Sequence, residues 1–252
     1  MGTIIAIGGG NNGRKLNDGT TEFYNTELID REVVKATDKE NPNFLFICHA
    51  IDCLELQEEY FETMKRIYGG RFKCNCRILR TSELLNNEIT EEKLKWADII
   101  YEGGGDTLSM IDLWKKSKFD KKLFNAYNDG KVICGISAGA VCWFNSCNSS
   151  YFNKFITVEC LNWIDLYMTP HCNESGRLEY TKKALRDNNL LGIALSNQCA
   201  LHIIGDMYRV LVSGNDAYCL KSYWDNSKYI EQRIEPSMEF KDINELFNRS
   251  VL

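Results

Sequence analysis

No stretch of the sequence is apolar for long enough to cross a membrane. The longest apolar runs, residues 3–7 and 44–48, have the length of strands, whereas a membrane-spanning helix needs about 20 residues. Blocks of like charge are also missing, and 30 Lys and Arg stand against 35 Asp and Glu, which gives a net charge of −5. Nucleic acids and anionic membranes attract basic surfaces, so neither is an expected partner.

Proline is scarce, with 3 residues in 252, and no Pro- or Ser-rich linker or internal repeat divides the chain. The composition, 44% apolar and 26% charged, is that of a globular protein and excludes fibrous and disordered classes. We therefore expect a single domain over residues 1–252, present as a monomer or a homodimer.

Paired metal ligands are absent from the sequence. The 11 cysteines show no C-x-x-C spacing, and His49, His171 and His202 lie far apart, so we expect reduced, mostly buried thiols and no metal site. The first ten residues have no basic region and too short an apolar run for a signal peptide. These features predict a cytoplasmic protein.

What is present is a regular alternation of elements. Short β-branched runs alternate with amphipathic segments through the first 145 residues, which is typical of βαβ units in a parallel sheet. The predicted strands are residues 3–7, 44–48, 76–79, 98–101 and 131–134, and the predicted helices include residues 25–37, 56–68 and 107–116. The predicted fold is α/β with three layers, in which helices cover both faces of a mainly parallel sheet.

The pattern changes after residue 190 to closely spaced strands joined by turn signals such as Gly205-Asp206 and Gly214-Asn215. The predicted strands are residues 192–195, 200–204, 208–213, 217–224 and 229–234. We expect an antiparallel meander at the edge of the sheet, followed by a short helix over residues 237–247.

The strongest local signal is Gly-Ile-Ser-Ala-Gly at residues 135–139. A β-branched run precedes it and an apolar helical pattern follows, which is the strand-turn-helix context of a nucleophile elbow. Gly135 and Gly139 would leave room for a strained serine, and the helix would direct its N-terminal dipole and the Ala138 N–H at the reacting group of Ser137. The alternative is a glycine-lined turn with an incidental serine.

A second strand-turn-helix pattern is Tyr-Glu-Gly-Gly-Gly-Asp-Thr-Leu at residues 101–108. Consecutive glycines let backbone N–H groups converge on an anion, and Asp106 or Thr107 can cap the helix behind them. Parallel strands end at the same edge of a sheet, where α/β proteins build their sites. We expect this turn to lie beside Ser137; a phosphate-binding turn is the alternative.

A third glycine cluster, residues 8–13, fits G-x-G-x-x-G after a strand, and Asp30 lies near the acidic position of a dinucleotide fingerprint. The next helical pattern begins only near residue 25, so a pyrophosphate would have no helix N-terminus to bind. We therefore expect no nucleotide cofactor.

A serine nucleophile needs a base, and three histidines are available. His171 follows the strand-like run 166–170, in which Pro170 ends the strand and leaves the next side chain on a loop. We rank His171 first, His49 second because it ends a predicted strand, and His202 last because it lies within one.

Together these motifs resemble the dipeptidase E and cyanophycinase family of serine peptidases, whose members have a class I glutamine-amidotransferase-like, flavodoxin-related fold. The resemblance extends over nearly the whole chain. Its other components are the N-terminal Ile-Ile-Ala-Ile-Gly-Gly-Gly, Pro170-His171 and Gly-Ile-Ala-Leu-Ser-Asn-Gln-Cys-Ala-Leu at residues 192–201. The family favours small peptides or isopeptides with an aspartyl residue at the cleaved bond and uses no metal or other cofactor.

The resemblance implies acyl transfer to water. Ser137 would be the nucleophile and His171 the general base, while the N–H groups of Gly104, Gly105 and Ala138 would hold the oxyanion.

The third member of the triad departs from the family pattern. The family carries an acid at or near the positions of Ser196 and Asn197 in this sequence. An amide oxygen can orient an imidazole, but it does not balance the imidazolium charge. We interpret Asn197 as the orienting residue, with Glu174 and Asp165 as alternative acids near His171 in the sequence.

Two further residues are candidates for binding substrate, namely Asp106 and Arg177. Arg177 could receive an acidic carboxylate, although an exposed position on a solvated helix also explains it.

The alternative to a peptidase is a catalytically weak or inactive relative that binds a small ligand or partner in the same cleft. An α/β-hydrolase esterase is disfavoured because its histidine lies near the C-terminus, whereas about 50 residues follow His202.

Overall fold

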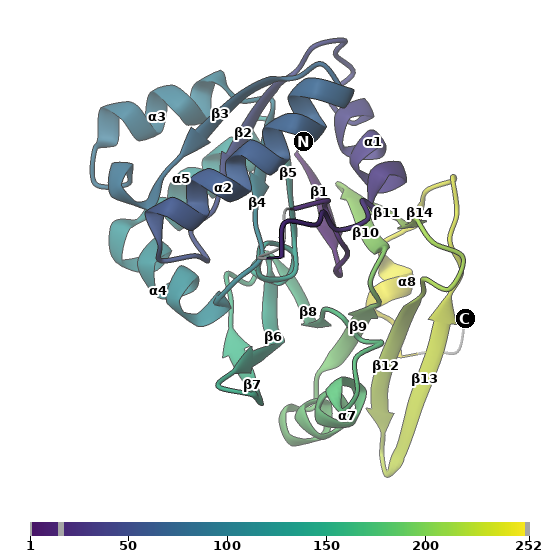
Figure 1. Ribbon diagram of the computed structural model, residues 1–252. Coiled ribbons are helices and arrows are strands. Elements are labelled where there is room, and N and C mark those ends of the chain that lie inside the picture. The colour runs from purple at the N-terminus through teal and green to yellow at the C-terminus, as the bar shows by residue number, and fades with distance from the viewer. Residues whose placement is uncertain (1, 15–17, 250–252) are drawn as a thin grey trace.

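The computed structural model describes residues 2–14 and 18–249, which form two β-sheets and the helices that pack on them (Figure 1). The first sheet has the strand order β14-β11-β10-β1-β5-β4-β2-β3. Its parallel strands are β1 (Thr3–Ile7), β2 (Asn43–Ile47), β3 (Asn75–Leu79), β4 (Ile99–Glu102) and β5 (Val132–Ile136). Its antiparallel strands are β10 (Cys199–Ile204), β11 (Met207–Val212) and β14 (Lys241–Asp242).

Helices cover both faces of the first sheet. Alternate side chains of β1 point to opposite sides, so Ile5 and Ile7 join the apolar cluster beneath α1 and α2, while Ile4 and Ala6 join the cluster beneath α3, α4 and α5. The bounds are α1 (Glu27–Lys35), α2 (Leu54–Lys65) with a π-helical continuation (Arg66–Arg71), a 3₁₀ turn (Thr81–Glu83), α3 (Asn87–Trp96), α4 (Thr107–Ser117) and α5 (Phe119–Asn128). Nearly continuous apolar strands are required here because both faces are buried.

The second sheet has the order β13-β12-β9-β8-β6-β7. Its strands are β6 (Phe144–Tyr151), β7 (Lys154–Glu159), β8 (Ile164–Thr169), β9 (Leu191–Leu195), β12 (Cys219–Asp225) and β13 (Lys228–Ile234). The remaining helices are α6 (Ala138–Val141), which leads from the first sheet to the second, α7 (Arg177–Asn188), which packs on the second sheet, and α8 (Asn244–Phe247).

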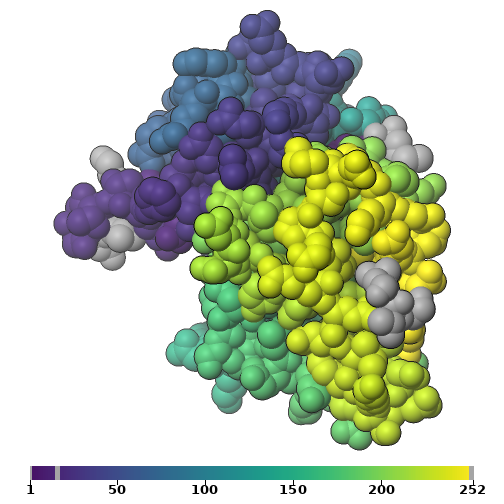
Figure 2. Space-filling model, turned by 90° about the vertical axis from the view of Figure 1, so that its right-hand side faces the viewer, coloured from purple at the N-terminus to yellow at the C-terminus, as the bar shows by residue number. Residues whose placement is uncertain are grey.

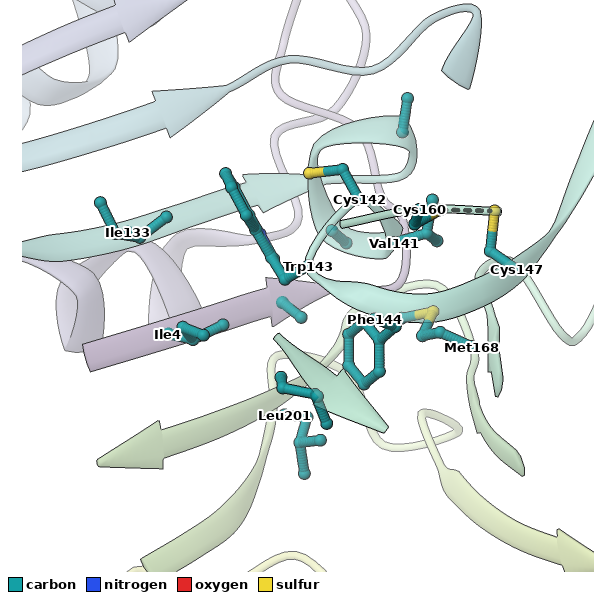
Figure 3. Packing of buried hydrophobic residues seen from close by; sticks show 14 of the residues in the cluster. Ile4, Ile133, Val141, Cys142, Trp143, Phe144, Cys147, Cys160, Met168 and Leu201 are labelled. Atoms are coloured by element: carbon teal, nitrogen blue, oxygen red, sulfur yellow. Dashed lines mark hydrogen bonds between the residues drawn. The ribbon is translucent and has the colours of Figure 1, made fainter. Parts of the chain in front are cut away.

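One apolar core joins the two sheets (Figure 3). Trp143 and Phe144 follow α6 and are fully buried, with Ile4 and Ile133 from the first sheet and Met168 from the second in the same cluster. Burial of apolar area stabilises the folded state by about 25 cal/mol per Å². Because residues of both sheets share this core, it holds the ends of β5 and β8 in fixed positions relative to each other. Those two strand ends carry Ser137 and His171.

The α/β class and the five parallel strands predicted from the sequence are confirmed, with end shifts of one or two residues. The C-terminal strands do not form one meander at a sheet edge. β10 and β11 extend the first sheet, whereas β9, β12 and β13 belong to the second. Apolar alternation gives each strand a buried face but does not select its neighbour, because that depends on which edge is open after the rest of the chain has packed.

The predicted helix over residues 237–247 is wrong for most of its length. Only Asn244–Phe247 is helical, and Lys241–Asp242 pairs with β11 instead.

The N- and C-terminal parts of the chain lie side by side on one face of the molecule (Figure 2), where Glu32 of α1 forms an ion pair with Arg209 of β11. Among the described residues, no helix is long and apolar enough to span a bilayer.

Candidate active site

Ser137 stands between the end of β5 and the start of α6. Its backbone has φ 56° and ψ −112°, a strained conformation for a residue with a side chain. The turn is possible because Gly135 and Gly139 approach the Glu102 carbonyl, where an added Cβ would lie 2.5 and 2.2 Å from that oxygen. The crowding expected at both glycines therefore comes from the neighbouring strand β4.

His171 lies on the loop after β8 and faces Ser137. Its Nε2 is 2.9 Å from the Ser137 Oγ, and its Nδ1 is 2.6 Å from the Oδ1 of Asn197. An amide oxygen only accepts, so Nδ1 carries a hydrogen and donates to Asn197, which leaves the lone pair of Nε2 directed at the serine. The structure thus brings together the three residues predicted from the sequence.

The N-terminal glycine turn supports the histidine from the other side. The carbonyl of Gly8 accepts the His171 backbone N–H at 3.0 Å. A Cβ added to Gly9 would lie 2.1 Å from the Oδ1 of Asn197 and 2.2 Å from the Nδ1 of His171. The sequence assigns this cluster to the family resemblance and disfavours it for nucleotide binding, but does not predict its contact with the base; the signal for that position is a glycine run after a strand with no helix behind it.

The electrostatic environment favours the neutral form of His171. Burial lowers the pKa of His171 below its usual value, and Arg177 acts in the same direction, while Asn197 and Glu174 oppose the shift. Glu174 is the nearby acid that reaches the ring, with Oε1 3.9 Å from Nδ1. Asp165, the other acid considered, accepts a hydrogen bond from Asn145 instead.

The second glycine turn lies against the serine, as expected. A Cβ at Gly104 would be 3.3 Å from the Ser137 Cβ. Gly105 has φ 155°, and a Cβ there would lie 2.2 Å from the Ala50 carbonyl oxygen. Among residues 2–14 and 18–249, the N–H groups of Gly105 and Ala138 have no hydrogen-bond acceptor, so both are available to an anion beside Ser137.

The side chains of Asp106 and Arg177, the two candidates for binding substrate, differ in their hydrogen bonds to the rest of the chain. The Oδ1 of Asp106 accepts the N–H groups of Leu108 and Ser109, which confirms it as the N-cap of α4. Arg177 is buried rather than exposed on a helix, and its Nε donates to Glu174 at 2.8 Å. One nitrogen of its guanidinium, Nη1, has no partner within the described residues.

The other two histidines lie outside this arrangement. His49 accepts a hydrogen bond from the Trp114 indole and bonds the Leu79 carbonyl, each at 2.9 Å, and burial lowers its pKa to about 4. His202 lies within β10 beside Arg209, and burial lowers its pKa to about 3. Neither contacts Ser137, so the second-ranked position of His49 as a base is not supported.

Two other acidic residues, Glu102 and Asp30, are buried outside the group formed by Ser137, His171 and Asn197. Glu102, at the end of β4, is fully buried behind the glycine turn. Asp30, the candidate ribose ligand, is instead buried among the hydroxyls of Tyr24, Thr26 and Tyr68. Among the residues described by the structure, no group of three or more His, Cys, Asp or Glu side chains is placed to hold a metal ion.

A serine at a strand-helix turn, bonded to a histidine that an amide orients, places the molecule among α/β proteins with the constellation of serine hydrolases. The chain belongs to peptidase family S51, whose family model matches residues 16–211. The resemblance noted in the sequence is thereby confirmed.

Two curated proteins are similar in sequence. The uncharacterized peptidase YgaJ of Bacillus subtilis (strain 168) is 33% identical over 118 residues, which cover 46% of this chain and 51% of YgaJ. The uncharacterized peptidase Lmo0363 of Listeria monocytogenes is 31% identical over 109 residues, 40% of this chain and 52% of that protein. The chain therefore spans about half the length of the curated relatives it matches.

Solved structures support the fold. A peptidase from an acI-B1 Actinobacterium superposes with a TM-score of 0.69 at 18% identity, covering 96% of this chain and 97% of that one. A protein of Listeria monocytogenes EGD-e named for peptidase E superposes with a TM-score of 0.57 at 18% identity, covering 93% and 100%. At this identity the likeness defines the mixed α/β fold alone.

Proposed function

We propose that the protein is a serine peptidase of the dipeptidase E type that hydrolyses small peptides. The observation that carries the proposal is the hydrogen-bonded chain from Ser137 Oγ through the His171 ring to Asn197 Oδ1, with separations of 2.9 and 2.6 Å. A nucleophile, a neutral base and an orienting acceptor within hydrogen-bond reach are the requirements for covalent acyl transfer.

In the first half of the reaction, Ser137 Oγ forms a bond to the carbonyl carbon of the scissile amide while its proton passes to His171 Nε2. The N–H groups of Ala138 and Gly105 hold the negative charge on the carbonyl oxygen, whereas the Gly104 N–H, also expected in this role, bonds the Tyr60 hydroxyl. When the C–N bond breaks, Nε2 gives its proton to the leaving amine. The acyl group remains on Ser137 as an ester.

In the second half, water replaces the amine. His171 Nε2 takes a proton from the water as its oxygen attacks the ester carbon, and it returns the proton to Ser137 Oγ as the C–O bond breaks. Asn197 keeps Nδ1–H in place through both halves. Glu174, whose carboxylate lies 3.9 Å from Nδ1 and whose side chain is 47% exposed, offsets the imidazolium charge only weakly.

The substrate side of the site is assigned to the pair of Glu174 and Arg177, with Asp106 at the mouth of the glycine turn. The Arg177 Nη1, which lacks a partner among the described residues, is a donor for a substrate carboxylate. This favours acidic peptides, with an aspartyl residue at the cleaved bond. The 11 free cysteines support a reducing, cytoplasmic compartment.

The test is hydrolysis of a panel of dipeptides and isopeptides, with and without N-terminal Asp. We expect cleavage of the aspartyl members by the wild type and a loss of at least about 10⁴-fold in kcat for Ser137→Ala and His171→Ala. A fluorophosphonate probe, which reacts with activated serines, should label the wild type and not Ser137→Ala.

Labelling that persists in Ser137→Ala would contradict the assignment of the nucleophile. A folded wild type that neither hydrolyses the panel nor reacts with the probe would favour the alternative, an inactive relative that binds a ligand in the same cleft. That alternative is motivated by the amide of Asn197 where the family carries an acid.

A further inference from the structure

Glu102 occupies the junction of the three segments that surround Ser137. It is the last residue of β4 and immediately precedes the glycine turn. Its carbonyl oxygen lies against Gly135 and Gly139 of the elbow, and its side chain reaches the loop after β2, where Oε1 accepts the Ala50 N–H at 3.2 Å. One residue therefore contacts the elbow, the glycine turn and the loop beside it.

Both backbone polar groups of Ala50, its N–H and its carbonyl, are hydrogen-bonded. Its N–H donates to Glu102, and its carbonyl accepts the Asp106 N–H at 2.8 Å. The same carbonyl limits the space at Gly105, where an added Cβ would lie 2.2 Å away. The position of Ala50 consequently sets the position of the glycine turn opposite Ser137.

The surroundings of the Glu102 carboxyl favour its neutral form. The side chain is fully buried, and Oε2 has no hydrogen-bond partner among the described residues. Burial raises the pKa of Glu102 well above its usual value, and the backbone N–H groups of Ala50, His49 and Gly103 only partly oppose this shift. None of the cationic side chains that the structure describes takes part, and an unpaired charge without a cation is costly in such a place.

We propose that Glu102 is a positioning residue that, in its protonated form, braces Ala50 and the glycine turn against Ser137 so that the turn can stabilise the oxyanion. The inference rests on the proposed serine-peptidase function. It goes beyond that function by making the oxyanion side of the site dependent on a neutral acid that never touches the substrate.

The experiment compares Glu102→Gln with Glu102→Leu. Glutamine keeps the acceptor for Ala50 and carries no charge, whereas leucine removes the acceptor at similar volume. Asp30→Asn is the matched control, because Asp30 is also a buried acid and, within residues 2–14 and 18–249, its carboxyl bonds the hydroxyls of Tyr24, Thr26 and Tyr68 alone.

The first measurement is hydrogen exchange of residues 48–51 and 103–106, which needs no substrate. Glu102→Leu should increase exchange in both segments, and Glu102→Gln and Asp30→Asn should leave it as in the wild type. Unchanged exchange in a folded Glu102→Leu protein would overturn the inference, whatever the activity.

The second measurement is the rate of fluorophosphonate labelling and of peptide hydrolysis. We expect Glu102→Leu to lower kcat by about 10²-fold with little change in KM, because the loss is confined to the transition state, and Glu102→Gln to stay within about threefold of the wild type. If the wild type reacts and Glu102→Leu reacts equally fast, the inference fails while the peptidase proposal stands. A wild type that does not react overturns both.

The third measurement is the pH profile, which a purely structural role of the side chain would not change. Ionisation of Glu102 would leave an unpaired charge in a buried place, and the water that it draws in should loosen the turn, so the wild-type rate should fall as the pH rises and the rate of Glu102→Gln should not. Three titratable side chains face Glu102, namely Cys48 from the loop after β2, Tyr60 from α2 and Cys142 from the end of α6, and burial raises the pKa of each. They are present in both proteins, so a difference between the profiles reports Glu102; identical profiles would contradict the need for its neutral form.

Discussion

The two sheets contribute to the site in different ways. From the first sheet come Ser137 and the glycine turn, each at the end of one parallel strand and each followed at once by its own helix. From the second come His171 and Asn197, which are 26 residues apart in the sequence and meet after separate strands, with Gly9 of the first sheet packed against both. The nucleophile is therefore positioned locally, whereas the base depends on how the sheets pack together.

Gly9→Ala should have the largest effect, because Gly9 lies where the first sheet meets His171 and Asn197. Its Cβ would lie 2.1 Å from the Asn197 Oδ1 and 2.2 Å from the His171 Nδ1, so the histidine must move away from the serine. A displacement near 1 Å costs about 10²-fold in rate, and we expect kcat to fall by about that factor or more while the protein stays folded.

Gly70→Ala is the control for Gly9→Ala, because an added Cβ at Gly70 meets no atom within 4 Å. Peptide hydrolysis and circular dichroism of both variants provide the measurement. Equal activity of the two would mean that the N-terminal turn does not support the base.

The histidines outside the site should govern stability rather than rate. The pKa of His49 is lowered from 6.5 to about 4, so below pH 6.5 the unfolded chain binds a proton that the folded chain excludes. The contribution of His49 to stability should be greatest at and above neutral pH and decline by about 3 kcal/mol between pH 6.5 and 4, while the buried carboxyls of Glu102 and Asp30, whose pKa values are raised, act in the opposite direction. Urea unfolding of the wild type and of His49→Gln at several pH values measures this, and a difference between the two proteins that stays constant over that range would contradict it.

Asn197→Asp tests how far the residue that orients His171, which comes from the second sheet, limits the rate. A carboxylate in place of the amide would stabilise the imidazolium, so we expect kcat to rise by about tenfold. It would also raise the pKa of His171, and the acidic limb of kcat/KM, which lies below pH 6.5 in the wild type because burial lowers that pKa, should move to higher pH. An unchanged or lower rate in the folded variant would argue that another residue orients His171.

Glu174→Gln should have the smallest effect. Glu174 lies 3.9 Å from the His171 Nδ1, but its side chain is 47% exposed, so solvent screens most of its field. We expect the acidic limb of kcat/KM to move to lower pH by less than about 0.5 units. Glu179→Gln, an exposed acid in the first turn of α7, is the control, and a larger shift there than in Glu174→Gln would contradict a direct effect on His171.

Local sequence patterns predicted one half of the molecule well. The strands of the parallel sheet are apolar on both faces and bounded by glycine turns, so β1 and β5 could be found from residues next to each other in the chain. The elbow at Ser137 could be found for the same reason, because the glycines that permit it lie two residues on either side.

The second sheet was only partly predictable. Its strands β9, β12 and β13 were found as strands but assigned to the wrong sheet, and the helix expected at residues 237–247 is mostly absent. Asn197 was found only because a family resemblance directed attention to residues 192–201. Glu102 lies in a quoted motif, yet no local signal separates a buried neutral acid from an exposed one.

The sequence by itself determined the α/β class, the strained serine turn and the candidates for the base, because each depends on backbone preferences and polarity within a few neighbouring residues, whereas Asn197 came from the family resemblance. Only the tertiary structure decided that His171 rather than His49 faces Ser137, that Gly9 lies against the histidine, and that Arg177 and Glu102 are buried. These facts depend on contacts between segments far apart in the chain, and such contacts are fixed when the shared core around Trp143 closes and excludes water.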